Sequence, residues 1–294
     1  MKYKKNWYNS ENIWKRRLAS YYSKLSGYLT YKPLKYIGMF LGMVLSKAPI
    51  IFSSSLKQEL RLTTKMPTSL DIKVIVDRTK DHSRAQFCNK ERLTCEWVTK
   101  YYQKGDTIYD IGANIGAVSL VSAAHLKKDC LIYSFEPLPS TFNMLFKNIM
   151  INDFDKVIVP LNIALSDKVE ISNFNLTSIE SGTSGHSVDD KSVLRNFNKS
   201  LTVFTQTLVN LVESYHIKLA DHIKIDVDGI DYRVLLGGEK SVLNNPTLKT
   251  ILIEKNDNED KIRDLVKKYG FVEIELKDRK GVYGNIGFVR DYKS

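Results

Sequence analysis

The stretch DIGANIG contains four residues whose types and spacing suit a nucleotide-binding turn: Asp110, Gly112, Asn114 and Gly116. Glycine adopts backbone angles that other residues avoid, and it lets a ligand approach the main chain. The apolar run before the turn predicts a strand, and the small residues after it predict a helix whose first N–H groups would point at a bound anion. A dinucleotide-binding fingerprint reads G-x-G-x-x-G, and this turn departs from it at the middle and last positions.

A carboxylate follows the next predicted strand. Glu136 lies 20 positions after Gly116. At this distance an acidic residue at the end of the second strand accepts hydrogen bonds from the ribose hydroxyls of a bound nucleotide. A free carboxylate here disfavours a 2′-phosphate, so the turn and Glu136 together indicate an unphosphorylated adenosine group.

Short apolar runs alternate with helical segments from about residue 67 onward, which predicts a mostly parallel sheet with helices on both faces. The predicted strands span residues 107–111, 131–136, 157–161, 222–227, 250–254, 271–276 and 286–290. A Gly-containing connection without room for a crossover helix joins the last two, which predicts an antiparallel last strand. In an open sheet the ligand lies beyond the carboxyl ends of the strands, where the turn and Glu136 fall.

The clearest helix follows the second strand. Phe142, Leu145, Phe146 and Ile149 form one apolar stripe at helical spacing. Pro139 lies near the start, where its missing N–H costs nothing. We therefore predict a helix that packs this stripe against the sheet.

The basic charge of the chain is concentrated at the N-terminus. The 294 residues carry a formal net charge of +11, and residues 1–66 contain 13 Lys and Arg against only Glu11 and Glu59. Residues 67–294 contain 31 basic and 31 acidic side chains and are formally neutral. The charge therefore belongs to an N-terminal arm, residues 1–66, and predicts no nucleic-acid partner for the main domain, residues 67–294.

The arm combines a basic amphipathic helix with a short apolar run. Apolar residues recur at helical spacing from residue 14 to residue 29. The apolar run at residues 36–46 is shorter than the ~20 residues of a membrane-spanning helix, and it lacks the features of a signal peptide. We expect residues 1–52 to contact the cytoplasmic face of an anionic membrane, or to pack on the main domain or on a second subunit of a homo-oligomer. Three widely spread cysteines fit a reducing cytosol and a cytoplasmic protein.

Five segments occur in the order found in one enzyme family. They are GDTIYDIGANIGAVSL, YSFEPLPSTFNMLFKNIMIN, NIALSD, IKIDVDGIDYRVLLGG and ILIE. Over about residues 85–290 the chain resembles the FkbM-type S-adenosylmethionine-dependent methyltransferases. The resemblance implies the Rossmann-like, seven-stranded fold of the class I methyltransferases, many of which O-methylate sugars, polyketides or other hydroxylated molecules. Two features depart from the family: the usual DVEG reads DVDG, with Asp228, and residues 1–66 lie outside the match.

The resemblance implies S-adenosylmethionine as the cofactor. It places the turn around the methionine portion and Glu136 on the ribose. The expected cofactor-binding residues are Asp110, Gly112, Ala113, Asn114, Gly116, Glu136, Pro137 and Ala164.

Methyl transfer to a hydroxyl needs the acceptor oxygen in line behind the methyl carbon and a group that takes the hydroxyl proton. Candidates at the ends of strands four and five are Asp226, Asp228, Asp231, Glu254 and Asn256. Asp226 is favoured, because a carboxylate near the end of an apolar strand is costly unless it is used. For Asp228 a catalytic role and a helix cap stay alternatives, and Asp231 shares the capping role. In metal-dependent relatives of this fold such carboxylates hold Mg²⁺, so Asp226 and Glu254 are also candidate metal ligands.

An insert at residues 162–221 separates strands three and four and is longer than an ordinary connection. Its tract TSIESGTSGHSVDD is polar and contains glycine, as expected of a mobile loop over a polar acceptor. His186 in this tract is a third catalytic candidate, as a base or an acceptor contact, and the alternative is a solvated loop histidine. His216 and His222 are assigned to a helix end and a strand edge.

The sequence thus predicts an S-adenosylmethionine-dependent O-methyltransferase that acts on a hydroxyl of a sugar, glycan or glycolipid precursor. Two alternatives stay open. One is an NAD-dependent sugar-modifying enzyme on a related fold, and the other is a non-catalytic membrane-associated adaptor that retains the cofactor fold.

Overall fold

The computed structural model describes residues 63–66, 68–76, 86–179, 187–188, 199–255, 258–276 and 284–292. These residues belong to one compact unit, Leu62–Ser294. The predictions made for residues 1–52, for His186 and for Asn256 lie outside the described residues. The division of the chain at residue 66 stays a prediction.

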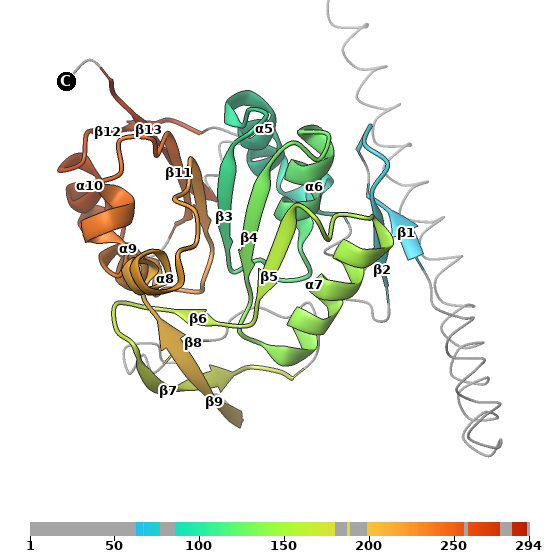
Figure 1. The fold of residues 1–294 in the computed structure, drawn as a ribbon, viewed down its shortest axis with the longest axis horizontal. Helices are drawn as coiled ribbons and strands as arrows, with labels where there is room; N and C mark the ends of the chain where they lie inside the picture. The colour runs from blue at the N-terminus through green and yellow to red at the C-terminus, as the bar shows by residue number, and fades with distance from the viewer. Residues whose placement is uncertain are drawn as a thin grey trace, which may run out of the picture. The chain divides into compact units, whose positions relative to one another are not determined.

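A seven-stranded sheet forms the centre of the unit, in the order β12-β13-β11-β10-β3-β4-β5 (Figure 1). Its strands are β3 (Thr107–Ile111), β4 (Leu131–Phe135), β5 (Ile158–Leu161), β10 (His222–Ile225), β11 (Thr250–Glu254), β12 (Phe271–Ile274) and β13 (Asn285–Arg290). Neighbouring strands pair in parallel except at β13, which is antiparallel to both β11 and β12. All seven predicted strands and the antiparallel last strand are confirmed, and several strands are shorter than predicted.

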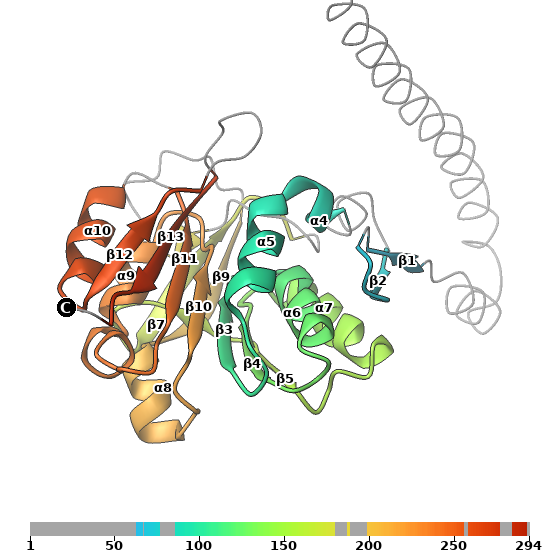
Figure 2. The same cartoon turned by 90° about the horizontal axis from the view of Figure 1, so that it is seen from above.

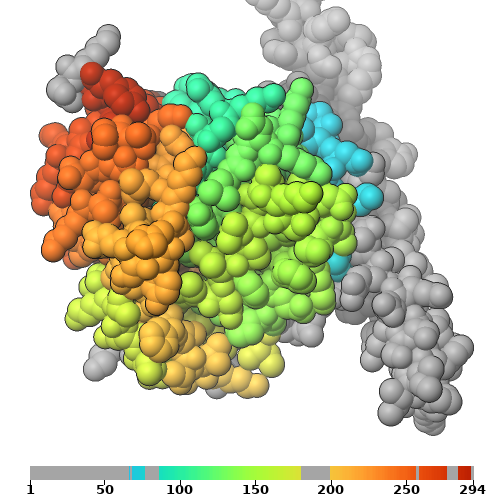
Figure 3. Space-filling model, viewed as in Figure 1, coloured from blue at the N-terminus to red at the C-terminus, as the bar shows by residue number. Residues whose placement is uncertain are grey.

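Helices cover both faces of this sheet, as predicted (Figure 2). One face carries α5 (Arg92–Tyr101), α6 (Ala117–His125) and α7 (Pro139–Ile151), with α4 (Phe87–Lys90) beside α5. The other carries α8 (Leu208–Tyr215), α9 (Asp231–Leu236), the π-helix η1 (Glu239–Leu243) and α10 (Glu259–Lys267). In the space-filling view the green and orange parts of the unit lie directly against each other (Figure 3). All five residues of β3 are buried, as expected of a parallel strand covered on both faces.

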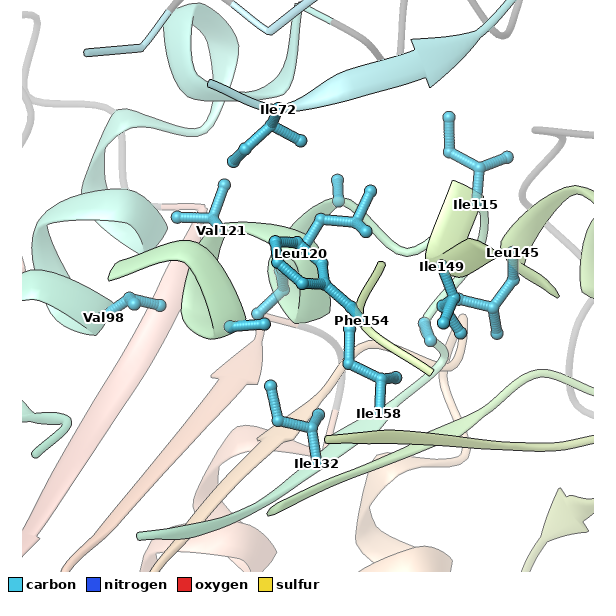
Figure 4. Packing of buried hydrophobic residues seen from close by; sticks show 14 of the residues in the cluster. Ile72, Val98, Ile115, Leu120, Val121, Ile132, Leu145, Ile149, Phe154 and Ile158 are labelled. Carbon is cyan, nitrogen blue, oxygen red and sulfur yellow. The ribbon is translucent and has the colours of Figure 1, made fainter. Parts of the chain in front are cut away.

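One buried cluster fixes α6 and α7 on the sheet. Ile132 and Ile158 from the sheet belong to the same cluster as Leu120 of α6 and Ile149 of α7, and Ile72 joins it from the segment before β2 (Figure 4). Burial of each such side chain stabilises the fold by roughly 1.5–3 kcal/mol. Because α6 follows the DIGANIG turn directly, this packing also holds the turn.

Helix α7 corrects one sequence-based expectation. Pro139 is its first residue and Leu145 is buried as predicted, but Phe146 is 47% exposed. The buried face instead includes Asn148, whose Oδ1 accepts from Ile75 N (2.9 Å) and whose Nδ2 donates to Ile115 O (2.9 Å). Ile149 is also buried and Phe142 packs against the same cluster, so the predicted stripe is confirmed except at Phe146. Asn148 also ties α7 to β2 (Lys73–Ile75), which pairs with β1 (Thr63–Lys65).

The insert contains a second sheet that the sequence analysis did not predict. Its order is β6-β9-β7-β8. The strands are β6 (Ala164–Leu165), β7 (Glu170–Leu176), β8 (Ser187–Val188) and β9 (Lys199–Gln206). Ile171 and Phe204 pair across β7 and β9 and are 68% and 60% exposed. Apolar residues therefore lie on the exposed face of this sheet as well, and the sequence lacks the regular alternation that predicts a strand. Helix α8 follows and ends at His216, a helix end as predicted, with φ of +55°.

A polar cluster joins the amino ends of three central strands. His222, assigned to a strand edge, is the first residue of β10 and is fully buried. Its Nε2 lies 2.8 Å from Asp106 Oδ2 and its Nδ1 lies 2.8 Å from Thr250 Oγ1, while Lys249 Nζ donates to Asp106 Oδ1 (2.6 Å). Burial lowers the pKa of His222, and hydrogen bonds from His222 and Lys249 outweigh burial and hold the pKa of Asp106 at about 2. The cluster stabilises the edge of the sheet that faces away from the predicted ligand.

Two further features bear on the predicted setting of the chain. No helix among the described ranges has the length and apolar character needed to cross a bilayer. Two cysteines lie closer than the sequence suggested, since Cys95 Sγ is 2.9 Å from Cys88 Sγ between α5 and α4. Both are free thiols.

Candidate active site

The DIGANIG turn connects β3 to α6 through left-handed backbone. Gly112 has a φ of +74°, Asn114 of +52° and Gly116 of +93°. A Cβ on Gly112 would lie 1.9 Å from the carbonyl oxygen of Asp226, and one on Gly116 would lie 2.6 Å from Leu145 Cδ1. Close approach of backbone therefore requires glycine at position 112, whereas at position 116 the neighbour is a flexible side-chain end and the positive φ is the stronger constraint.

The turn is held by the strand beside it. The backbone N–H groups of Gly112 and Ala113 both donate to Phe135 O, at 3.0 and 2.9 Å. Ala113 is buried, whereas Gly112 and Asn114 are half-buried. The exposed side of the turn is thus limited to a few backbone atoms at the carboxyl end of β3.

Asp110 lies behind this turn. Its side chain is fully buried, and its Oδ2 accepts from Ser119 N (3.1 Å) and Ser119 Oγ (2.6 Å) in α6. An anion near a helix N-terminus is stabilised by the helix dipole. The carboxylate that the sequence analysis assigned to the cofactor therefore holds the first turn of α6 in place.

Glu136 follows β4 and faces the turn. Its Oε2 accepts from Asn114 N (3.0 Å) and its Oε1 accepts from Leu138 N (2.9 Å). The residue is only 7% exposed, and this burial raises the pKa of Glu136 to about 7 despite the two backbone donors. Each carboxylate oxygen has a second lone pair, so the two oxygens of Glu136 fit as acceptors for the paired hydroxyls of a ribose.

The remaining predicted cofactor residues flank Glu136. Asn162 Nδ2 donates to Glu136 O (2.8 Å) and to Pro137 O (3.0 Å), which fixes the chain after β4. Ala164, in β6, is buried in a small cluster with Leu138. Pro137 thus borders the site, and Ala164 supports it from the insert.

A second turn follows β10, and Asp231 organises it. Asp228 has a φ of +53° and Gly229 of +106°. Asp231 accepts from Val227 N (3.4 Å) and Gly229 N (3.3 Å), and its burial raises its pKa to about 6. The predicted cap is wrong for both residues, because the N-cap of α9 is Ile230 and no side chain caps the helix, whereas Asp231 supplies the acidic charge in its first turn.

A pocket of about 160 Å³ lies beyond the carboxyl ends of β10 and β11. It is lined by Phe87, Glu91, Thr94, Lys224, Ile225, Asp226, Asp228, Leu252, Glu254, Gly284 and Asn285. The side chain of Asp226 is 44% exposed. Burial raises the pKa of Glu254 to about 8, with the Asp226 carboxylate and a hydrogen bond to it adding to the effect. Glu254 therefore holds its proton more tightly than an isolated glutamate does, because it lies beside the Asp226 carboxylate.

The sequence analysis missed Lys224 at the base of this pocket. Its Nζ donates to Gly112 O (3.2 Å) and lies 3.3 Å from Asp226 Oδ2 and 3.5 Å from Asp110 Oδ1. These acidic partners and hydrogen bonds outweigh burial and raise the pKa of Lys224. A signal was present, because residues two apart on a strand face the same side, so Lys224 and Asp226 in IKIDV belong together.

The predicted magnesium site gains no complete ligand set within the described part of the chain. Asp226 and Glu254 lie together, but no three His, Cys, Asp or Glu side chains there are grouped to hold a metal ion. Asn256 and His186 lie outside the described residues. The metal site stays a prediction.

Fold and site together define a class of enzyme. A seven-stranded sheet with one antiparallel strand next to its edge, a glycine turn after the first central strand and an acidic residue after the next are the features of class I methyltransferases. The methyltransferase FkbM domain model matches residues 110–275. The chain belongs to this family, and its domain is of the S-adenosylmethionine-dependent methyltransferase type.

A curated relative is the hexuronic acid methyltransferase AglP of Haloferax volcanii, which is 27% identical over 135 residues. The match covers 46% of this chain and 51% of AglP, so the chain spans about half the length of the curated relative it matches.

Two solved structures are similar at a lower level. The FkbM methyltransferase of Methylobacillus flagellatus KT has a TM-score of 0.48 and 11% identity, covering 71% of this chain and 53% of that one. TYW2 of M. jannaschii in complex with AdoMet has a TM-score of 0.41 and 12% identity, covering 79% and 87%. Similarity at this level bears on neither the cofactor nor the reaction of this chain.

Proposed function

We propose that the chain transfers a methyl group from S-adenosylmethionine to a hydroxyl of a sugar, glycan or glycolipid precursor. The observation that carries the proposal is the contact between the two turns. The DIGANIG turn, which suits the cofactor, lies against the backbone of Asp226, which opens into the pocket. A methyl donor and an acceptor bound on the two sides of this contact would be neighbours, and positioning supplies much of the rate of such a transfer.

The cofactor residues divide into contacts and supports. Glu136 is the proposed acceptor of the ribose hydroxyls, and the backbone of Gly112 to Gly116 is the proposed boundary of the methionine portion. Asp110 supports the turn from behind through Ser119. S-adenosylmethionine, when bound, supplies an electrophilic methyl group on a sulfonium.

Asp226 is the proposed general base. Its side chain is partly exposed in the pocket and lies beside Glu254, whose raised pKa favours the protonated form of that neighbour. Asp226 is therefore accessible to an acceptor hydroxyl, as a base requires. Asp226 accepts the hydroxyl proton while the oxygen–methyl bond forms and the carbon–sulfur bond breaks, with its electron pair left on sulfur. Asp228 also lines the pocket and is proposed to contact the acceptor.

A sugar acceptor is favoured by the relative AglP, whose name describes a hexuronic acid methyltransferase. The polar lining of the pocket suits a hydroxylated molecule. Carboxylates accept hydrogen bonds from hydroxyls, and side-chain amides both accept from hydroxyls and donate to them. Contact of residues 1–52 with a membrane, homo-oligomers and a cytoplasmic location stay predictions from the sequence.

The test supplies the full chain with S-adenosylmethionine labelled in the methyl group and a panel of neutral sugars, hexuronic acids and oligosaccharides. We expect label in an alkali-stable ether, with Glu136→Ala and Asp226→Asn each lowering the rate at least about 100-fold, the lower range for loss of a general base. Label in an alkali-labile ester or on nitrogen would contradict transfer to a hydroxyl.

A further inference from the structure

Lys224 is the one basic side chain among the residues that line the described pocket, and the family reaction proposed above gives it no task. Its Nζ lies near three oxygens from two segments: the Asp110 carboxylate and the Gly112 carbonyl of the first turn, and the Asp226 carboxylate after β10. Its side chain is only 9% exposed. A buried ammonium group is costly unless such partners surround it.

The three partners belong to the two halves of the candidate site. Asp110 and Gly112 form and support the turn assigned to the cofactor, whereas Asp226 faces the acceptor pocket. The two halves also touch through the backbone, because Asp226 N donates to Ile111 O (3.1 Å) and Gly112 has no room for a Cβ beside Asp226 O. Lys224 bridges the same boundary with its side chain.

We propose that Lys224 is a positioning residue that locks the cofactor turn to Asp226 and sets the charge at their boundary. Its role toward the cofactor rests on the function proposed above. By holding the Gly112 carbonyl it fixes the turn, and by lying between two carboxylates it offsets their charge where a cationic donor becomes a neutral product. Lys224 then influences how strongly the site prefers the cationic S-adenosylmethionine over the neutral S-adenosylhomocysteine.

This charge role separates Lys224 from a residue that only stabilises the fold. If Lys224 only stabilised the fold, its loss would weaken the binding of both cofactors by the same factor. Loss of one positive charge beside Asp110 and Asp226 favours the cationic cofactor over the neutral one, because the sulfonium feels the added negative field and the thioether does not.

The experiment measures dissociation constants of both cofactors by calorimetry on the full chain at neutral pH. Lys224→Gln is the test variant, and Lys224→Arg keeps the charge. Lys249→Gln is the matched control, since Lys249 also bridges two carboxylates, Asp106 and Asp221, but at the amino ends of the same strands.

We expect Lys224→Gln to raise the dissociation constant of S-adenosylhomocysteine about tenfold, which corresponds to the loss of one hydrogen bond to a charged group. We also expect the ratio of the two dissociation constants to shift at least about threefold toward S-adenosylmethionine. Lys224→Arg should restore the wild-type ratio, and Lys249→Gln should leave both constants within about twofold of wild type.

The inference is overturned if Lys224→Gln leaves the ratio of the two dissociation constants unchanged. It is also overturned if Lys224→Gln and Lys224→Arg weaken the binding of both cofactors equally. If Lys224→Gln does not fold, Asp226→Asn replaces it: loss of this negative charge should shift the ratio in the opposite direction, and an unchanged ratio again overturns the inference. A wild-type chain that binds neither cofactor contradicts the proposed function itself, whereas a wild-type chain that binds both isolates the test of Lys224.

Discussion

Binding of the cofactor should depend on pH through Glu136. The carboxyl is buried, and its pKa of about 7 lies well above the ordinary value of 4.5. Ribose hydroxyls that donate to the carboxylate favour its ionised form, so the bound state should have a lower pKa than the free chain. Affinity is therefore highest well above pH 7 and is lost as the pH falls through 7, because the cofactor must then displace a proton.

The magnitude follows from the same pKa. In the free chain about half of the Glu136 carboxyls are ionised at pH 7 and about a tenth at pH 6. We therefore expect the dissociation constant of S-adenosylhomocysteine to be about twofold larger at pH 7 and about tenfold larger at pH 6 than at pH 8. Calorimetry in two buffers with different ionisation heats should show release of close to one proton per binding event at pH 6.

A neutral variant provides the control. Asp231 and Glu254, with pKa values of about 6 and about 8, titrate in the same range. Glu136→Gln removes only the Glu136 titration, so the tenfold change between pH 8 and pH 6 should disappear in this variant. An affinity that is independent of pH in the wild type, or that increases toward pH 6, would refute the assignment of Glu136 to the ribose.

Three further predictions concern stability and are checked by denaturant unfolding of the full chain. Gly112→Ala should cost roughly 3 kcal/mol or more, because its Cβ meets the backbone of the second turn, whereas Gly105→Ala should cost only about 1 kcal/mol, since that glycine has a positive φ but nothing within 4 Å; equal costs would contradict the packing of the two turns. Asn148→Ala should cost about 2–3 kcal/mol through loss of its two backbone partners, and a cost below 0.5 kcal/mol would contradict the placement of α7. Asp106→Asn should cost about 3 kcal/mol through loss of the carboxylate that accepts from His222 and Lys249, and an unchanged stability would contradict a stabilising role of the cluster at the amino ends.

The sheet could be predicted because its strands are buried. Strands such as β3 (TIYDI) and β11 (TILIE) are short, mostly apolar runs between helical segments, and this is the pattern that burial on both faces of a sheet requires. The glycine turn could also be predicted, since Gly112 and Gly116 occupy backbone angles that few other residues adopt. The second sheet could not be predicted, because the exposed apolar residues Ile171 and Phe204 break the alternation of apolar and polar residues that would mark its strands.

The directions of the polar side chains could not be read from the sequence. Asp110 stands next to the turn in sequence, but the hydroxyl and N–H of Ser119 draw its carboxylate under α6. The bridge made by Lys224 depends on the register of β10 beside β3, which pairs Lys224 with Asp110. The Lys224 contact joins residues 112 positions apart, and one chain without a structure gives no measure of the register between such distant strands.

The central claim is most directly tested by calorimetric titration of the full chain with S-adenosylhomocysteine, with NAD as the comparison ligand and Glu136→Ala as the control variant. We predict binding of S-adenosylhomocysteine in the micromolar range, no comparable binding of NAD, and loss of binding in Glu136→Ala. Tighter binding of NAD, or binding of S-adenosylhomocysteine that Glu136→Ala leaves unchanged, would contradict the proposed use of the DIGANIG turn and Glu136.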